Sequence, residues 1–168
     1  MVNIKRWFRH AFMPPWRWRV LFPQTALADI EKAVKDSEHQ HSAELRFAVE
    51  NALALGQVWR SVSARQRAIE VFSNLQVWDT EQNSGVLIYL LLADREVHIV
   101  ADRGIAKRVA QVEWDNIAKA MQREFLQGDF LSGSLQGIER ITTLLSTHFP
   151  PGADNPDELS NKPIIVKR

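Results

Sequence analysis

The sequence predicts an α/β protein in which helices cover both faces of a central β-sheet. The main observation is an apolar run from Val86 to Ala93, bounded by polar segments. These eight residues are too few for a transmembrane helix, which needs about 20. The Val, Ile and Tyr content is typical of a strand buried on both faces. Such a strand requires helices on each side of its sheet, and four amphipathic segments elsewhere in the chain can supply them.

Three elements are expected before this run. Residues 25–40 carry an apolar stripe at helical spacing behind Thr25, a suitable N-cap, and predict the first helix. Residues 42–52 alternate polar and apolar side chains, so we expect a strand with one buried face near the edge of the sheet. Residues 63–75 begin with the capping-box pair Ser63 and Gln66 and predict the second helix, after a loop at 54–62.

A hairpin and two more helices follow. A turn at 94–96 leads into a second strand, residues 97–101, antiparallel to the first. An apolar stripe from Trp114 to Phe125 predicts the third helix, and residues 134–148 predict the fourth, which Pro150 and Pro151 end. Residues 164–166 either add an edge strand or remain disordered.

Charge divides the chain into a basic, aromatic arm at 1–24, a domain at 25–150 and a tail at 151–168. Five of the 21 Lys and Arg residues and none of the 20 acids lie within residues 1–22. The remaining residues therefore carry 16 basic and 20 acidic side chains, a local charge of −4. No cleavage site of a signal peptide follows the arm, so we expect the mature chain to retain it.

Three roles are open for the arm. Its aromatic side chains can pack back onto the domain, or its Trp and Arg residues can hold it at a membrane surface. Binding of a single nucleic-acid strand is the third role, and the net negative charge of the domain argues against nucleic acid as a partner. The residues that we expect to contact a membrane or a protein partner are Trp7, Arg9, Trp16, Arg17 and Trp18.

Several kinds of catalytic site are excluded or weakly supported. The chain has no cysteine, which excludes disulfides, thiolate metal sites and a cysteine nucleophile. The phosphate-binding, zinc-protease and serine-hydrolase motifs are absent. His98 and His148 have no recognisable nucleophile partner, and His39 and His41 are interpreted as a polar helix end because residues two apart do not share a helix face.

Oxygen-bearing side chains at the ends of the hairpin form the best candidate site. Asp79, Glu81 and Asn83 precede the first strand and Asp102 follows the second, so all four lie at the same end of the hairpin. This set is suited to a hard cation, Ca²⁺ or Mg²⁺, although acids in turns often bond only to nearby backbone. Asp94 lies at the opposite end of the hairpin and is not expected to take part.

At these residues the sequence resembles the TPM domain family. The similarity covers about residues 26–149 and depends on an ordered set of segments: Trp78, Asn83–Ile88, Asp94–Arg95, Asp102–Ile105, Phe125, Gly128–Phe130 and Gly137–Ile138. The resemblance implies a three-layer α/β/α sandwich with a mixed central sheet and, with the elements above, about four main helices. Most members carry a signal peptide and a membrane span, so we expect a short, non-secreted bacterial subgroup.

The resemblance also implies two functions. Some members are similar to metal-binding or membrane-associated accessory proteins, and bacterial members often accompany a membrane protein of the LemA type. We therefore expect an accessory domain in the cytoplasm, with peripheral attachment at the inner membrane as the position that the arm allows. The alternative is a metal-assisted phosphatase, since a chloroplast member has been described as an acid phosphatase and as a factor in photosystem repair. Asp102, which stands where most members have glycine, would then help hold the metal, and Arg103 would contact the phosphate.

Overall fold

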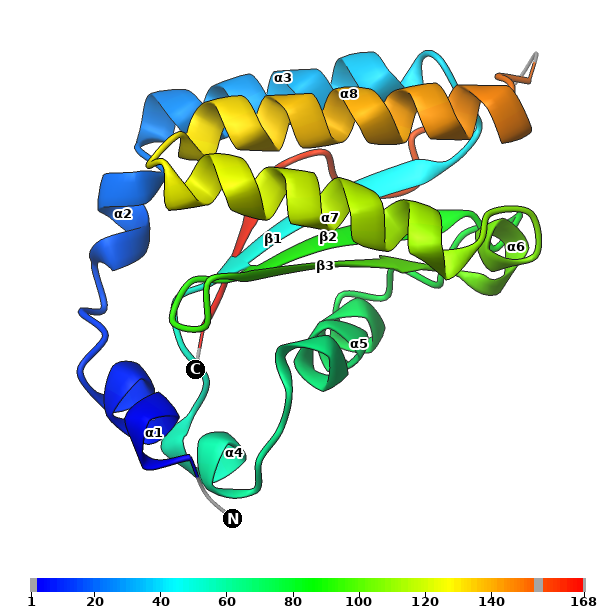
Figure 1. Ribbon diagram of the computed structural model, residues 1–168. Coiled ribbons are helices and arrows are strands. Elements are labelled where there is room, and N and C mark those ends of the chain that lie inside the picture. Colours follow the sequence, from blue (N-terminus) through cyan, green and yellow to red (C-terminus); the bar gives the residue numbers. More distant parts are fainter. Residues whose placement is uncertain (1–2, 153–155, 168) are drawn as a thin grey trace.

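In a computed structural model of the protein, which describes residues 3–152 and 156–167, a mixed four-stranded sheet lies between two layers of helices (Figure 1). The predicted three-layer α/β/α sandwich is thus confirmed. Eight helices occur within the described ranges, four of which are long, so the expected number of main helices is correct and four short ones are added. Residues 1–2, 153–155 and 168 of the predicted arm and tail lie outside the described ranges.

The sheet has the strand order β3-β2-β1-β4. Strands β1 (Glu44–Glu50) and β2 (Gly85–Leu91) are parallel, and β4 (Ile164–Val166) pairs in parallel with the other side of β1. Strand β3 (Glu96–Ala101) is antiparallel to β2 and forms the expected hairpin with it. Every residue of β2 is buried, as the apolar run predicts.

Three long helices cover one face of the sheet (Figure 1): α3 (Gln24–Glu38), α7 (Gln111–Leu126) and α8 (Phe130–His148). Leu45, Phe47 and Val49 of β1 point into the core on this side, where Trp114 of α7 is the largest fully buried side chain. The turn between α7 and α8 uses Gly128 with φ at +93°, a conformation that glycine adopts without steric cost. A short helix, α6 (Arg103–Ala106), directly follows β3 and precedes α7.

The other face of the sheet packs against α5 (Ala64–Asn74) and the short helix α4 (Leu55–Trp59). The predicted loop at 54–62 therefore contains a helical turn. The arm forms α1 (Ile4–Ala11) and α2 (Arg17–Leu21), and α1 packs beside α4 (Figure 1). No helix within the described ranges is long and apolar enough to cross a membrane.

The strand predicted at 42–52 lies near the sheet edge, next to the short edge strand β4, but the prediction that it buries only one face is wrong. Strand β1 lies between β2 and β4, and both of its faces are buried. The polar face is covered because Arg67 of α5 binds Glu50 through Nε and Nη2, at 2.9 and 3.1 Å, and Tyr89 Oη donates a 2.6 Å hydrogen bond to the same carboxylate. These partners allow a charged side chain to lie inside the sandwich.

Candidate functional site

A buried carboxylate at the β2–β3 turn holds the arm against the domain. The side chain of Asp94 is 3% exposed. Arg6 of α1 donates to it from Nε and Nη2, the latter at 2.7 Å, and Arg9 donates at 3.1 Å. His10 Nδ1 accepts the Leu53 N–H, so the ring proton lies on Nε2, which donates to Asp94 at 3.0 Å. Three side chains of one helix therefore converge on a single acid.

This attachment leaves the opposite side of α1 in water. Ile4, Phe8 and Phe12 lie four residues apart and form one stripe, and all three are exposed, Phe12 by 75%. The rings of Phe8 and Phe12 stack with their centroids 5.8 Å apart. Trp59 on the neighbouring helix α4 is also 67% exposed.

Of the five arm residues predicted to contact a membrane or partner, two pack against the domain and three are exposed. Trp7 packs against the core beneath α5, and Trp18 packs against the core beneath α7 and α8. Trp16 and Arg17 are exposed, and Arg9 is half exposed although it binds Asp94. The contact role of all five stays a prediction, and Trp16, Arg9 and Arg17 have the most accessible side chains of the set.

The predicted metal residues lie at one end of the hairpin, as expected. Asp102 N–H donates to the Gly85 carbonyl, which joins the segment after β3 to the start of β2. Asp102 Oδ1 caps α6 by accepting the Arg103 N–H at 2.7 Å, and Asn83 Oδ1 accepts from Arg103 Nε at 3.0 Å. Two of the predicted ligands therefore have local partners.

The three acids of that set, Asp79, Glu81 and Asp102, are not gathered. Among the described residues, the potential metal ligands that do gather are a different trio, Glu38, Glu44 and Asp157, whose ligand atoms lie within 4.8 Å of one another. The metal role of Asp79, Glu81, Asn83 and Asp102 and the phosphate role of Arg103 thus stay predictions.

A polar cavity of about 380 Å³ lies at the same end of the sheet. Lys107 and Arg108 bring positive charge to its wall, and Ser42, Gln82 and Ser84 add polar groups. Ser84 is 3% exposed, and within the described ranges its Oγ has no hydrogen-bond partner. These groups are suited to an oxyanion rather than to a cation.

The carboxylates of Glu38, Glu44 and Asp157 could hold a metal ion, since their ligand atoms lie within 4.8 Å of one another. Ca²⁺ binds oxygen at about 2.3–2.6 Å, so ligands on opposite sides of one ion are at most about 5 Å apart. Burial raises the pKa of Glu38 to about 8, although the N–H of Leu45 donates to its carboxylate. Burial also raises the pKa of Glu44, whose Oε2 accepts the Leu159 N–H at 3.0 Å.

Sequence reasoning missed Asp94 and this acidic trio. A signal for Asp94 was present: it is an acid in a hairpin turn, where side chains are accessible, and the basic arm needs an acidic partner. Glu38 at the end of α3 and Glu44 at the start of β1 are close in sequence, but Asp157 lies more than 100 residues later, in the tail. No sequence spacing could indicate it.

Comparison with known proteins supports the fold. The family description "TPM domain" matches residues 20–144. The solved NMR structure of BA42 protein from the psychrophilic bacterium Bizionia argentinensis is 32% identical and superposes with a TM-score of 0.75. That comparison covers 84% of this chain and 93% of the BA42 chain. A search of curated proteins found no match.

Proposed function

Because the chain belongs to the TPM domain family, we propose that it is an accessory protein that docks on an anionic membrane surface through α1 and α2. The observation that carries the proposal is the exposed stripe of Ile4, Phe8 and Phe12 on a helix that Asp94 holds in place. Docking there would attach the protein peripherally at an inner membrane and beside a membrane protein, such as one of the LemA type.

The charges on α1 are arranged to favour this orientation. Lys5 and Arg9 each follow a stripe residue by one position and therefore lie along one side of the stripe, where Arg9 also reaches Asp94. Arg6 and His10 lie on the opposite side and bind Asp94. Each Lys or Arg near an anionic bilayer contributes about 1 kcal/mol. An amphipathic helix with aromatic and basic residues on its outer side is typical of attachment in the plane of the interface.

Flotation with liposomes tests the proposal. The protein is expected to float with vesicles that contain phosphatidylglycerol, to float less with pure phosphatidylcholine, and to be released by salt. Phe8→Ser combined with Phe12→Ser should abolish flotation. The matched control is Ile69→Ser combined with Val112→Ser, two exposed apolar residues elsewhere. Equal flotation of both double variants would overturn the proposal.

We propose further that Glu38, Glu44 and Asp157 bind Ca²⁺ or Mg²⁺. The three carboxyl groups lie close enough to share one ion, and because burial raises the pKa of Glu38 to about 8, binding of a divalent cation near neutral pH would displace its proton. Calorimetric titration with Ca²⁺ should lose its signal in Glu44→Gln and keep it in Asp79→Asn and Asp102→Asn. The reverse pattern would assign the cation to the hairpin end instead.

Phosphate-ester hydrolysis is the second candidate function, and the polar cavity with Lys107, Arg108 and Ser84 favours it. Turnover of p-nitrophenyl phosphate with added Ca²⁺ or Mg²⁺ is the assay. Substitution Lys107→Ala should reduce turnover more than Lys119→Ala, which alters a lysine outside this cavity. Equal turnover in wild type and both variants would remove the cavity as the site, and Asp102→Ala tests the predicted hairpin residues in the same assay.

A further inference from the structure

A cavity of about 530 Å³ lies where the arm meets the domain. Its apolar lining comes from three places: Met13 and Leu21 of the arm, Leu90 and Leu92 around the end of β2, and Phe125 and Phe130 of the α7–α8 turn. The volume falls within the range of about 300–1,000 Å³ that is usual for small-molecule sites. The lining is therefore suited to an aliphatic body.

Two guanidinium groups add positive charge to this apolar lining. Arg17 of α2 and Arg95 of the β2–β3 turn both line the cavity, and within the described residues neither forms an ion pair. The acid in the lining, Glu96, accepts a 2.9 Å hydrogen bond from His98. The cavity thus has a net positive charge from side chains that remain available to a ligand.

The backbone at Arg95 adds a second indication. Its φ is +58°, in the left-handed region that a long side chain occupies at a cost of about 1 kcal/mol or more. Glycine or asparagine would fit this turn position with less strain. Within the described residues the Arg95 side chain forms no hydrogen bond or ion pair, so its guanidinium is available to a ligand in the cavity that it lines.

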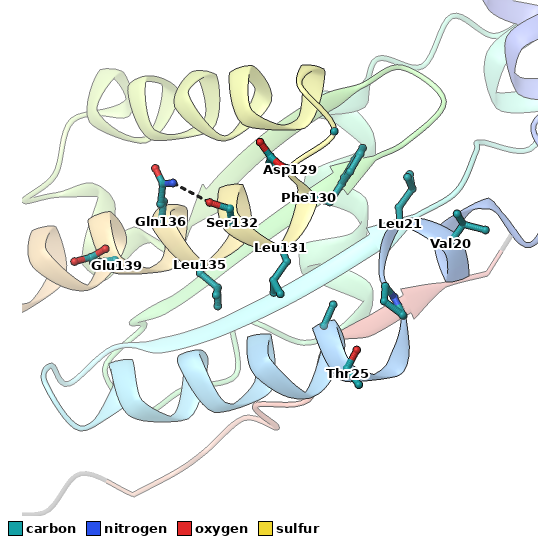
Figure 2. Close-up of a pocket in the computed structure, with 13 residues that line it drawn as sticks. Val20, Leu21, Thr25, Asp129, Phe130, Leu131, Ser132, Leu135, Gln136 and Glu139 are labelled. Atoms are coloured by element: carbon teal, nitrogen blue, oxygen red, sulfur yellow. Dashed lines mark hydrogen bonds between the residues drawn. The ribbon is translucent and has the colours of Figure 1, made fainter.

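A neighbouring cavity provides a contrast. It measures about 690 Å³ and shares Leu21, Gly128 and Phe130 with the first. Figure 2 shows Leu21 and Val20 from α2 on one side of it and Leu131 and Leu135 from α8 on the other, with Asp129 and Glu139 nearby. Its charged lining residues are acids, so this cavity does not favour an anionic group.

We propose that the cavity lined by Arg17 and Arg95 binds an anionic amphiphile, with the phosphate or carboxylate head on the two guanidinium groups and the aliphatic chain among Met13, Leu21 and Phe130. Arginine binds such heads through paired N–H donors. The site extends the proposed membrane function, because the exposed residues Trp16, just before α2, and Val20, within it, are next in sequence to the lining residues Arg17 and Leu21. It does not require a membrane, since a free amphiphile has the same chemistry.

Calorimetry in the absence of vesicles tests the site, with decyl phosphate below its micelle concentration as the probe. We expect decyl phosphate to bind at least tenfold more tightly than inorganic phosphate, decanol or decyltrimethylammonium. Arg17→Gln and Arg95→Gln should each weaken binding about tenfold, the loss expected for one charge-assisted hydrogen bond. Arg19→Gln is the matched control, because Arg19 lies on the same helix and does not line the cavity.

Three results would overturn the proposal: equal binding of the cationic amphiphile, equal binding of inorganic phosphate, or wild-type affinity in both arginine variants. Glutamine has the same backbone preference as arginine, so Arg95→Gln does not change the strain at that turn. A nitroxide on the decyl chain should broaden the NMR signals of Leu21 and Leu92, and broadening elsewhere would also refute the site. The Phe8→Ser and Phe12→Ser variant should lose flotation and keep decyl phosphate binding, which separates this site from membrane docking.

Discussion

Replacing Asp94 with alanine should release α1 from the domain. The substitution removes the acceptor of the hydrogen bonds from Arg6, Arg9 and His10, whose closest donor atom lies at 2.7 Å. His10 is fully buried, so its Nε2–H would lose the Asp94 carboxylate where water has little access. The three donors all belong to one helix, and their loss is therefore expected to act as one event.

The expected loss of unfolding free energy depends on how exposed the Arg6 and Arg9 side chains are. Removing one member of a buried ion pair costs about 3–5 kcal/mol, because the other member stays desolvated. Here the Arg6 side chain is 16% exposed and that of Arg9 50%, so water can partly solvate both after the substitution. We therefore expect a loss at the lower end, about 3 kcal/mol.

Urea unfolding followed by circular dichroism measures this loss, and hydrogen exchange locates it. The amides of residues 7–12 should exchange faster in Asp94→Ala. The amides of β2 should still exchange only through global unfolding, as in the wild type. The control is Asp36→Ala, which removes an exposed ion pair with Lys32 and should leave stability nearly unchanged. A loss of unfolding free energy below about 1 kcal/mol in Asp94→Ala, with no change in the exchange of the α1 amides, would refute the role of Asp94 in holding α1.

Three further predictions concern the interior and pH. Tyr89→Phe removes the hydrogen bond to buried Glu50 and should cost about 1.5–3 kcal/mol in urea unfolding; a loss no greater than that of an exposed substitution would contradict it. Gly85→Ala would place a Cβ 1.8 Å from the Val77 carbonyl oxygen, so we expect a loss of at least about 2 kcal/mol in thermal or urea unfolding, and normal stability would show that the backbone can move. Burial lowers the pKa of His41 from 6.5 to about 4; the folded state thus binds a proton less readily, and stability that is present above pH 6.5 is lost as pH falls toward 4. His41→Gln should remove that part of the slope, and identical slopes for the two proteins would contradict the assignment.

The pH dependence that Asp94 contributes to stability has the same sign as that of His41 and lies at lower pH. Burial alone would raise the pKa of Asp94, but hydrogen bonds from His10 and Arg6 outweigh it and hold the pKa well below the usual 3.8. A lowered carboxyl pKa gives stability that is present above 3.8 and is lost only at more acidic pH. The His41 effect can therefore be measured between pH 4 and 6.5, where the hydrogen bonds from α1 to Asp94 remain formed.

The elements that local patterns specify were predictable from the sequence. The stripe from Trp114 to Phe125 faces the core on α7, with Phe125 partly buried at its end, and the apolar run forms β2. Each pattern requires only its own period and an apolar neighbour of any kind. The shared end of the hairpin was also predictable, since strand direction alone determines it.

The polar interior was not predictable, because its partners come from distant segments. Glu50 looks like a solvent-facing residue until Arg67 and Tyr89 are placed beside it. His41, interpreted as part of a polar helix end, is buried with Nε2 hydrogen-bonded to Ser37 Oγ, which in turn bonds Thr142 on α8. The structure overturns that interpretation for His41, because the two-residue spacing of His39 and His41 does not reveal a hydrogen-bond network that reaches another helix.

The pairing of β4 with β1 has a consequence for how the chain acquires its structure. The two strands are more than 100 residues apart in sequence, yet Leu159 and Ser160 supply the partners of Glu44 and Arg46. During synthesis from the N-terminus, the centre of the sheet therefore lacks its last neighbour until residues 157–166 have left the ribosome. A nascent chain shorter than this displays an unpaired, charged strand edge, and long-range pairing of this kind makes folding slow.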